Sequence, residues 1–376
     1  MPIIFTRYLY IKDEVEIALT TSILEKKDEA IFWAYELYYS GYKNETFDIL
    51  WKIYYYFFAS LNPCFETYFI KKHQEWLKCA TNDLDFYVST IVNNLIIRPF
   101  NLDVFLLHKI NTHLEFDEEE ETINVSDEND NDMFKTHLKQ HTYIQIAKHI
   151  LEHINDSSKI MEMAIDYFAP DKKTKLMKEW EKIKKFRGDQ YTSLILISRI
   201  MMFYSSQKIA KGKSFYVIVE PEDVIMYETI VPDKKLYSSY KILPLACLYS
   251  IDKYNYLSLF LIARKYEPKP MMCYFEKWLY YSSYSPVWAE RIKLFKGTIN
   301  HENKQITFDC DDSEEAFYDN YGYEPDEQKI ATQHKNMQPL KQERTWETFY
   351  NTHKSAGLFQ DEDGFVSCLE DIKLFE

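Results

Sequence analysis

Hydrophobic and polar residues recur with a helical period through the first third of the chain. Asp13 precedes a run in which apolar residues recur every four positions from Val15 to Ile23, which is typical of one buried helix face. A second helix is predicted from Asp28, a residue type that favours helix N-termini, to Gly41, a type that favours the position after a helix end. The first third is therefore expected to be a set of short helices.

The third segment, NETFDILWKIYYYFFASLNP, is apolar around most of its helical circumference. Asn44 is predicted to cap this helix and Pro63 to end it. At about 100° per residue, the polar side chains form only a narrow strip. A helix of this kind is normally buried among neighbouring helices, so we predict that it belongs to the core. The strip consists of Asp48, Lys52 and Ser60.

Helical periods cover most of the remaining sequence. Short helices joined by turns favour a mainly α fold of stacked antiparallel helical hairpins, either HEAT-like or an irregular helical array. β-prone runs at 214–230 and 298–309 predict one or two small β-hairpins in the C-terminal half. Further helices are predicted at about 65–77, 83–97, 102–112, 133–154, 158–168, 171–187, 190–205, 252–265, 271–281, 286–295 and 345–354.

Changes in composition divide the chain into four parts. An N-terminal helical domain covers 1–114, and an acidic loop or linker covers 115–132. A second helical domain with a β-hairpin insertion covers 133–310, and an acidic segment with short helices covers 311–376. The linker carries ten acidic residues and no basic one, so its charge of −10 accounts for most of the chain's net −14. We interpret it as a solvated spacer, with a docking or nucleic-acid-mimicking role as the alternative.

The residue counts narrow the classes of protein. Rossmann turns, phosphate loops and nucleophile elbows need glycine at fixed positions, and a chain with only 7 Gly is not expected to contain them. The 6 Cys are scattered without a C-x-x-C pair, which favours reduced thiols. The opening residues have no signal-peptide pattern, so we do not expect secretion. No apolar run approaches the ~20 residues that a membrane helix needs, so no membrane-spanning segment is predicted. No cofactor is predicted either.

The segment from Asp171 to Arg187 is the candidate nucleic-acid site. It carries eight basic residues against three acidic ones, with Trp180 and Phe186 between them. Basic and aromatic side chains on one helix can contact phosphates and stack on bases. The alternative is a solvated face around a buried stripe that includes Trp180. The predicted contacts are Lys175, Lys178, Lys182, Lys184, Lys185 and Arg187.

Aromatic side chains of the N-terminal helices are the candidate contacts for a protein partner. Exposed aromatic residues are typical of protein interfaces, whereas buried ones only stabilise the core. Core packing is the first interpretation of the Asn44–Pro63 helix, and a partner groove is the second. The predicted partner-binding residues are Trp33, Tyr38, Trp51, Tyr55 and Tyr56.

Three other motifs resemble known sites and are rejected. Two H-x-x-x-H pairs between His137 and His153 suit a metal by spacing, but no H-E-x-x-H accompanies them, so a solvated histidine face is predicted. The KGKS sequence at Lys211–Ser214 has Gln207 where a phosphate loop needs Gly. The segment Phe359–Glu370 resembles an EF-hand loop, but Phe359 replaces the first carboxylate ligand, so no calcium binding below the millimolar range is expected.

Several stretches carry a resemblance to a protein family. The runs DEAIFWAYELYYSGYKNETFDILWKIYYYFFASLNP, RPFNLDVFLLHKI and FYDNYGYEPDEQ resemble uncharacterised proteins of nucleocytoplasmic large DNA viruses, the giant viruses. The resemblance implies a viral source and a location in the host cytoplasm, in the viral factory, or in the virion. It implies no catalytic residue.

Three function classes follow. The leading one is a non-enzymatic helical adaptor or scaffold that binds a protein partner. Its specific form is a translation-initiation scaffold, because Tyr191–Ile197 and Tyr254–Phe260 fit the Y-x-x-x-x-L-Φ pattern of peptides that bind cap-binding factors. The first alternative is an RNA- or other nucleic-acid-associated factor that uses helix 171–187. The second is an enzyme whose site is not visible from the sequence.

Overall fold

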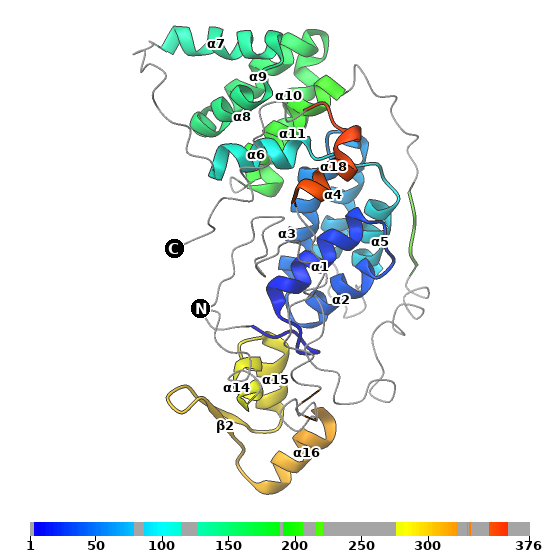
Figure 1. The fold of residues 1–376 in the computed structure, drawn as a ribbon, viewed down its shortest axis with the longest axis vertical. Coiled ribbons are helices and arrows are strands. Elements are labelled where there is room, and N and C mark those ends of the chain that lie inside the picture. The colour runs from blue at the N-terminus through cyan, green and yellow to red at the C-terminus, as the bar shows by residue number, and fades with distance from the viewer. Residues whose placement is uncertain are drawn as a thin grey trace.

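The computed structural model describes residues 4–78, 86–113, 127–188, 191–205, 216–220, 276–321, 329, 331 and 346–359. Over these residues the fold is mainly helical, with one small antiparallel hairpin, as the sequence predicts. Figure 1 shows an elongated molecule, with α7 to α11 at one end, the elements from α14 to α16 at the other, and α1 to α5 between them.

The N-terminal helices pack around one aromatic-rich core. Residues on the apolar face predicted from the sequence point into this core: Trp51, Tyr54 and Phe58 are completely or almost completely buried. The prediction that the Asn44–Pro63 segment belongs to the core is therefore confirmed. The helices are α1 (Lys12–Leu24), α2 (Ala30–Tyr39), α3 (Lys43–Ile53), α4 (Pro63–Lys78) and α5 (Phe86–Ile96).

Both predicted ends of that third segment are wrong in detail. The helix begins at Lys43, and Asn44 makes no side-chain capping bond. The segment also changes to a π turn over Tyr54–Phe58, in which the Ala59 N–H donates to the Tyr54 carbonyl at 2.8 Å. This wide turn leaves the Phe57 carbonyl available to accept the Asn101 N–H at 3.0 Å. Pro63 is the first residue of α4, where a missing N–H costs nothing.

The second half of this core is built around α11. Helix α11 contacts α6, α8 and α9, and its apolar residues from Leu194 to Tyr204 are almost all buried. The helices are α6 (Asp103–His113), α7 (Asp127–Gln140), α8 (Tyr143–Glu152), α9 (Ser157–Phe168), α10 (Lys173–Arg187) and α11 (Thr192–Ser205).

Two sequence predictions are corrected in this region. Helix α7 begins at Asp127, within the predicted linker, because acidic residues are favourable in a first helical turn and Phe134 further along is fully buried. The single helix predicted over 133–154 is two helices, since His141 has a positive φ of 61° that ends α7.

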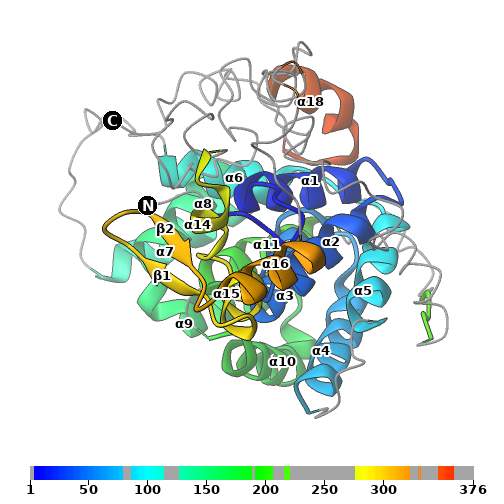
Figure 2. The ribbon, with the colours of Figure 1, turned by 90° about the horizontal axis from the view of Figure 1, so that it is seen from below.

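A second hydrophobic core lies at the other end of the molecule, where Figure 2 shows its elements grouped together. Phe5, Leu9 and Ile11 from the N-terminal segment pack there against residues 278–321. The β1–β2 pairing aligns Ile299 with Ile306, which confirms the predicted hairpin at 298–309. The elements are α14 (Trp278–Ser282), α15 (Pro286–Leu294), β1 (Thr298–Asn300), β2 (Gln305–Thr307) and α16 (Asp311–Tyr321).

The two cores do not follow the predicted domain boundaries. The first core takes side chains from α1 through α11, on both sides of the predicted linker, and the second joins residues 5–11 to residues 278–321. Helix α18 (Trp346–His353), which fits the helix predicted at 345–354, is followed by a 3₁₀ turn at Lys354–Ala356. Of the hairpin predicted at 214–230, residues 216–220 are described and form no strand, and residues 214–215 and 221–230 lie outside the described residues.

Candidate functional site

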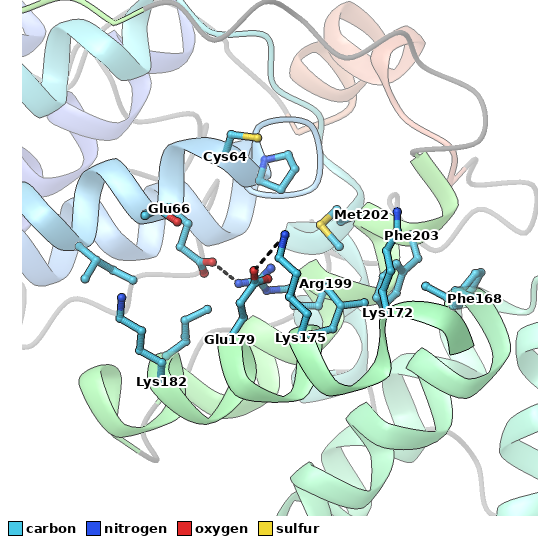
Figure 3. A pocket seen from close by; sticks show the side chains of 16 residues that line it. Cys64, Glu66, Phe168, Lys172, Lys175, Glu179, Lys182, Arg199, Met202 and Phe203 are labelled. Atoms are coloured by element: carbon cyan, nitrogen blue, oxygen red, sulfur yellow. Dashed lines mark hydrogen bonds and ion pairs between the residues drawn. The ribbon is translucent and has the colours of Figure 1, made fainter.

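A groove of about 630 Å³ opens between α4, α10 and α11. Figure 2 shows α4 and α10 next to each other, and Figure 3 shows the groove with its lining side chains. The volume lies in the range typical of ligand-binding pockets. The lining residues are Pro63, Cys64, Glu66, Thr67, Ile70, Phe168, Ala169, Lys172, Lys175, Leu176, Glu179, Lys182, Ile183, Arg199, Met202 and Phe203.

Helix α10 places lysines at the rim because its apolar residues face the core. Trp180 and Ile183 are buried one turn apart, and α10 packs on α9. The charged residues between these positions must then point outward, and Lys175, Lys178 and Lys182 are exposed. The local sequence therefore produces a cationic edge beside an apolar wall.

A buried ion pair between two helices forms part of the groove floor. The Arg199 guanidinium on α11 donates to the Glu66 carboxylate on α4 (Figure 3). The Tyr55 hydroxyl donates to the same carboxylate at 3.0 Å. Burial raises the pKa of Glu66 above its usual range, while Arg199 and the Tyr55 hydroxyl oppose that rise. The pair joins α4 to α11 and balances the charge of the floor.

The lining as a whole carries excess positive charge. Four cationic side chains face two carboxylates, and one of those carboxylates is held by Arg199. The second carboxylate, Glu179, lies 4.0 Å from the Lys175 ammonium. Neither Lys172 nor Lys182 forms an ion pair with another described residue. The rim therefore offers ammonium groups to an acidic ligand.

The basic surface continues onto the outer side of α10. A shallower hollow of about 470 Å³ is lined by Thr174, Lys175, Lys178, Glu179 and Lys182, and it shares three residues with the main groove. The cationic edge therefore extends from the groove onto the outer side of α10.

The structure separates the predicted nucleic-acid residues into two groups. Lys175, Lys178, Lys182 and Lys185 are exposed, as that prediction requires. Lys184 is half-buried and donates to the Ser157 hydroxyl at 3.1 Å.

Arg187 does not fit the prediction of a phosphate contact. Its guanidinium donates to Asp48 at 3.1 Å and lies over the rings of Trp51 and Tyr191 at 5.0 and 4.8 Å. Since its side chain is only 5% exposed, Arg187 ties α10 to α3 and is not available to a nucleic acid.

The predicted partner-binding aromatic residues lie mainly in the core. Trp33, Tyr38, Trp51 and Tyr55 are buried, and only Tyr56 is half-buried. Polar atoms of three of them are used internally: the Trp76 indole donates to the Tyr38 hydroxyl at 3.0 Å, the Trp51 indole donates to His73, and the Tyr55 hydroxyl donates to Glu66. The expectation that these side chains form an exposed face is wrong because each fills a gap between packed helices.

The rejected motifs have structural roles or lie elsewhere. His149 is buried and stacks on Phe134 and His153, with ring centroids 4.7 and 4.3 Å apart. Within the described ranges, no group of three or more His, Cys, Asp or Glu side chains is placed to hold a metal. Phe359 is buried, and the rest of the calcium-like loop, the KGKS sequence and Tyr254–Phe260 lie outside the described residues.

Sequence reasoning missed the groove floor. Glu66 and Arg199 are separated by 133 positions, and neither belongs to a motif. The one available signal was that each charged residue stands in an otherwise apolar helix face, where a buried charge needs a partner.

Comparison with protein-family models, with curated proteins and with solved structures gave no match for this chain. None of the described helices is both long and apolar enough to cross a membrane.

Proposed function

We propose that this chain is a non-enzymatic helical adaptor, and that the groove between α4, α10 and α11 binds an acidic, amphipathic segment of a protein partner. One observation carries the proposal: apolar walls stand below a rim of lysines, over a floor whose own charges are paired. This combination suits a ligand with one apolar face and flanking carboxylates.

The walls and the rim have separate tasks in this proposal. Ile70, Leu176 and Phe203 supply apolar surface for the partner's buried side chains. Lys172 and Lys182 attract carboxylates beside that face and set the orientation of the bound segment. The partner-binding surface is thus this groove, in place of the buried aromatic residues of α2 and α3.

A designed peptide tests the proposal directly. The probe is a labelled 20-residue helix with leucines at one face and glutamates elsewhere, titrated into the full chain by fluorescence anisotropy. We expect saturable binding that weakens as salt is added, since rim lysines are exposed to solvent. The same peptide with lysine in place of glutamate should bind at least about tenfold more weakly.

A matched pair of variants assigns the binding to the groove. Lys172→Glu/Lys182→Glu should weaken binding by roughly tenfold, because two attractive contacts become repulsive. Lys139→Glu/Lys159→Glu makes the same change in net charge at two exposed lysines outside the groove lining and should leave binding almost unchanged. An equal loss of peptide affinity in both variants would mean that net charge, and not the groove, governs binding, and the proposal would fail.

A nucleic-acid-associated role is the second candidate. It is favoured by the exposed Lys178 and Lys185, which extend the cationic edge beyond the groove and pair with no described acidic residue. Such a surface would contact phosphates and would carry little sequence preference.

Salt dependence and charge reversal test this candidate. With labelled single-stranded RNA as the probe, affinity should fall steeply between 50 and 200 mM salt, as in counterion release. Lys178→Glu/Lys185→Glu should abolish that binding and leave the acidic peptide bound, because neither lysine lines the main groove. RNA binding that is unaffected by added salt and by the double variant would mean that α10 is not the nucleic-acid contact.

The viral setting implied by the sequence resemblance is part of the same proposal. A giant-virus adaptor in the host cytoplasm, acting in translation initiation, would need an acidic or amphipathic ligand on an initiation factor. The Tyr191–Ile197 pattern does not supply that contact, since Tyr191, Leu196 and Ile197 are buried in and beside α11.

A further inference from the structure

The extended segment Tyr216–Glu220 lies against α4 and α5 and is held mainly by side chains. The Asn94 side-chain amide donates to the Val217 carbonyl at 2.7 Å and accepts the Val217 N–H at 3.0 Å. The Thr90 hydroxyl donates to the Val219 carbonyl at 3.4 Å. A single asparagine thus bonds both polar backbone groups of one residue, as the neighbouring chain of a β-sheet would.

The position of Asn94 makes this contact specific for an extended backbone. Asn94 is fully buried on α5, and its amide also donates to the Thr90 carbonyl. A buried amide that loses its hydrogen-bond partners destabilises the fold, so this surface is more stable when an extended chain covers it. These bonds recognise backbone atoms, and they therefore accept many sequences.

Two side-chain positions supply selectivity. The Tyr216 ring stacks on Tyr68 with centroids 4.4 Å apart, and the Arg98 guanidinium lies 4.2 and 5.2 Å from the rings of Phe65 and Tyr216. Val219, three residues later, is buried, whereas Ile218 between them is 65% exposed. The groove therefore selects an aromatic residue and, three positions on, a small branched aliphatic one.

We propose that the α4–α5 surface is a peptide-binding groove, that the chain's own Tyr216–Glu220 segment occupies it in cis, and that an extended partner peptide of the pattern aromatic-x-x-Val takes its place. The proposal does not depend on the lysine-rimmed groove, because Phe65 and Tyr68, the α4 side chains that contact Tyr216, do not line that groove. It gives the adaptor a second binding surface that is closed until a competing peptide arrives.

The test empties the groove and offers it a free peptide. In the full chain, Tyr216→Ser/Val219→Ser removes both selective side chains of the cis segment. A labelled SFYVIVEPE peptide, residues 214–222, should bind this variant saturably and bind the unaltered chain at least about tenfold more weakly, since a tethered competitor acts at an effective concentration near millimolar. Ile218→Ser, a change at the exposed position, should behave like the unaltered chain.

Two controls assign the binding to Asn94 and to the selected pattern. Asn94→Asp, added to the emptied variant, keeps the acceptor and loses the donor to the peptide carbonyl, so it should abolish binding. Asn93→Asp, at the neighbouring half-buried position, should not. A peptide with serine at the Tyr216 and Val219 positions should fail to bind. Absence of saturable binding to a folded, emptied variant would overturn the proposal, as would binding that survives Asn94→Asp.

If the emptied variant does not fold, hydrogen exchange on the unaltered chain decides the matter. Millimolar peptide should displace the cis segment and speed exchange of the Val217 amide, which is bonded to Asn94. Protection of Val217 that is unchanged at millimolar peptide contradicts the proposal.

Discussion

Trp51 shows how this chain uses its many aromatic residues. Its ring stacks on Phe69 with centroids 3.6 Å apart, and its indole N–H donates to the His73 ring nitrogen Nδ1 at 3.0 Å. The Arg187 guanidinium lies over the same indole. One side chain therefore contacts both α4 and α10 from α3, and buried aromatic residues of this kind hold neighbouring helices together.

Replacing Trp51 should be among the most damaging single changes. Trp51→Ala leaves a large cavity and an unpaired His73, so we expect a loss of about 3–5 kcal/mol in the free energy of unfolding, measured by urea denaturation. Tyr56→Ala, at a half-buried position, should cost clearly less. A Trp51→Ala protein with unchanged stability would contradict the core assignment.

His73 predicts a loss of stability in mild acid. Burial, with a smaller contribution from the positive charge of Arg187, lowers the pKa of His73 from 6.5 to about 4. The unfolded chain therefore takes up a proton on this residue at a higher pH than the folded chain does. The stabilising contribution of neutral His73 is full above pH 6.5 and falls as the pH drops from 6.5 toward 4.

The variant His73→Gln isolates this effect. Glutamine keeps an acceptor for the Trp51 indole and does not titrate, so the variant's stability should depend less on pH between 7 and 4. We expect the unaltered chain to lose roughly 3 kcal/mol more than the variant over that interval, by urea denaturation at each pH. Parallel pH profiles for the two proteins would show that His73 is not held neutral.

Helix α10 shows what the sequence determines at the level of an element. Its period alone predicts that Trp180 and Ile183 are buried and that the lysines are exposed, and the structure agrees for both apolar residues and for Lys175, Lys178, Lys182 and Lys185. The period does not reveal that Arg187 turns inward to Asp48, because that contact joins residues 139 positions apart. Periodicity describes one helix, whereas the groove and its floor depend on which helices become neighbours.

The π turn at Tyr54–Phe58 is a second feature that local sequence periodicity does not predict. Five consecutive aromatic residues fit a buried helix equally well in α or π geometry, and no local residue type distinguishes the two. The bond from Asn101 to the freed Phe57 carbonyl comes from a distant part of the chain. Tertiary contacts therefore determine the turn, and the sequence could predict only its burial.

The segment around α18 is attached to α6 through one carboxylate. Asp103 accepts the N–H groups of Leu358 and Phe359 at 2.9 and 3.1 Å, and Gly357 passes so close that an added Cβ would collide with the carboxylate. We predict that Gly357→Ala releases residues 346–359 from α6. Limited proteolysis should then cut this segment early, while the helical array resists.

Changes at Asp103 provide the control for that release. Asp103→Ala removes the acceptor and should release the same segment, whereas Asp103→Asn keeps one oxygen acceptor and should hold most of it. If Gly357→Ala is cleaved no faster than the unaltered chain, the close contact between Gly357 and Asp103 is not needed to hold residues 346–359 against α6.

The acidic stretch before α7 should be dispensable for the fold of the whole molecule. Replacing residues 117–126 by a Gly/Ser sequence of equal length removes five of the ten acidic residues of the predicted linker and leaves α7, with buried Phe134 and Leu138, intact. We expect the melting temperature to change by only a few degrees, since a run this acidic buries little apolar surface. A large fall in melting temperature would mean that this stretch is docked on the helices.

The two cores meet where the α2–α3 turn faces α15. Gly41 has a positive φ of 95°, and a Cβ added there would lie 2.5 Å from Cβ of Pro286, while the Val287 N–H donates to the Ser40 carbonyl at 3.3 Å. The N-terminal segment strengthens the junction, because the Trp288 indole donates to the Thr6 carbonyl at 3.0 Å and the buried Arg7 pairs with Glu36 at 2.8 Å. The absence of a side chain at Gly41 thus allows the second core to dock.

Gly41→Ala should loosen the second core without unfolding the first. Forcing a methyl group against Pro286 costs about 1–3 kcal/mol as overpacking, and that cost falls on the junction. Amides of α14 to α16 should then exchange faster with solvent, while those of α11 keep their protection. Gly188→Ala is the matched control, because Gly188 also has a positive φ but has no described atom within 4 Å of an added Cβ. Its backbone strain acts at the end of α10 and should leave α14 to α16 protected, so equal exchange in both variants would show that strain, and not the contact with Pro286, governs the junction.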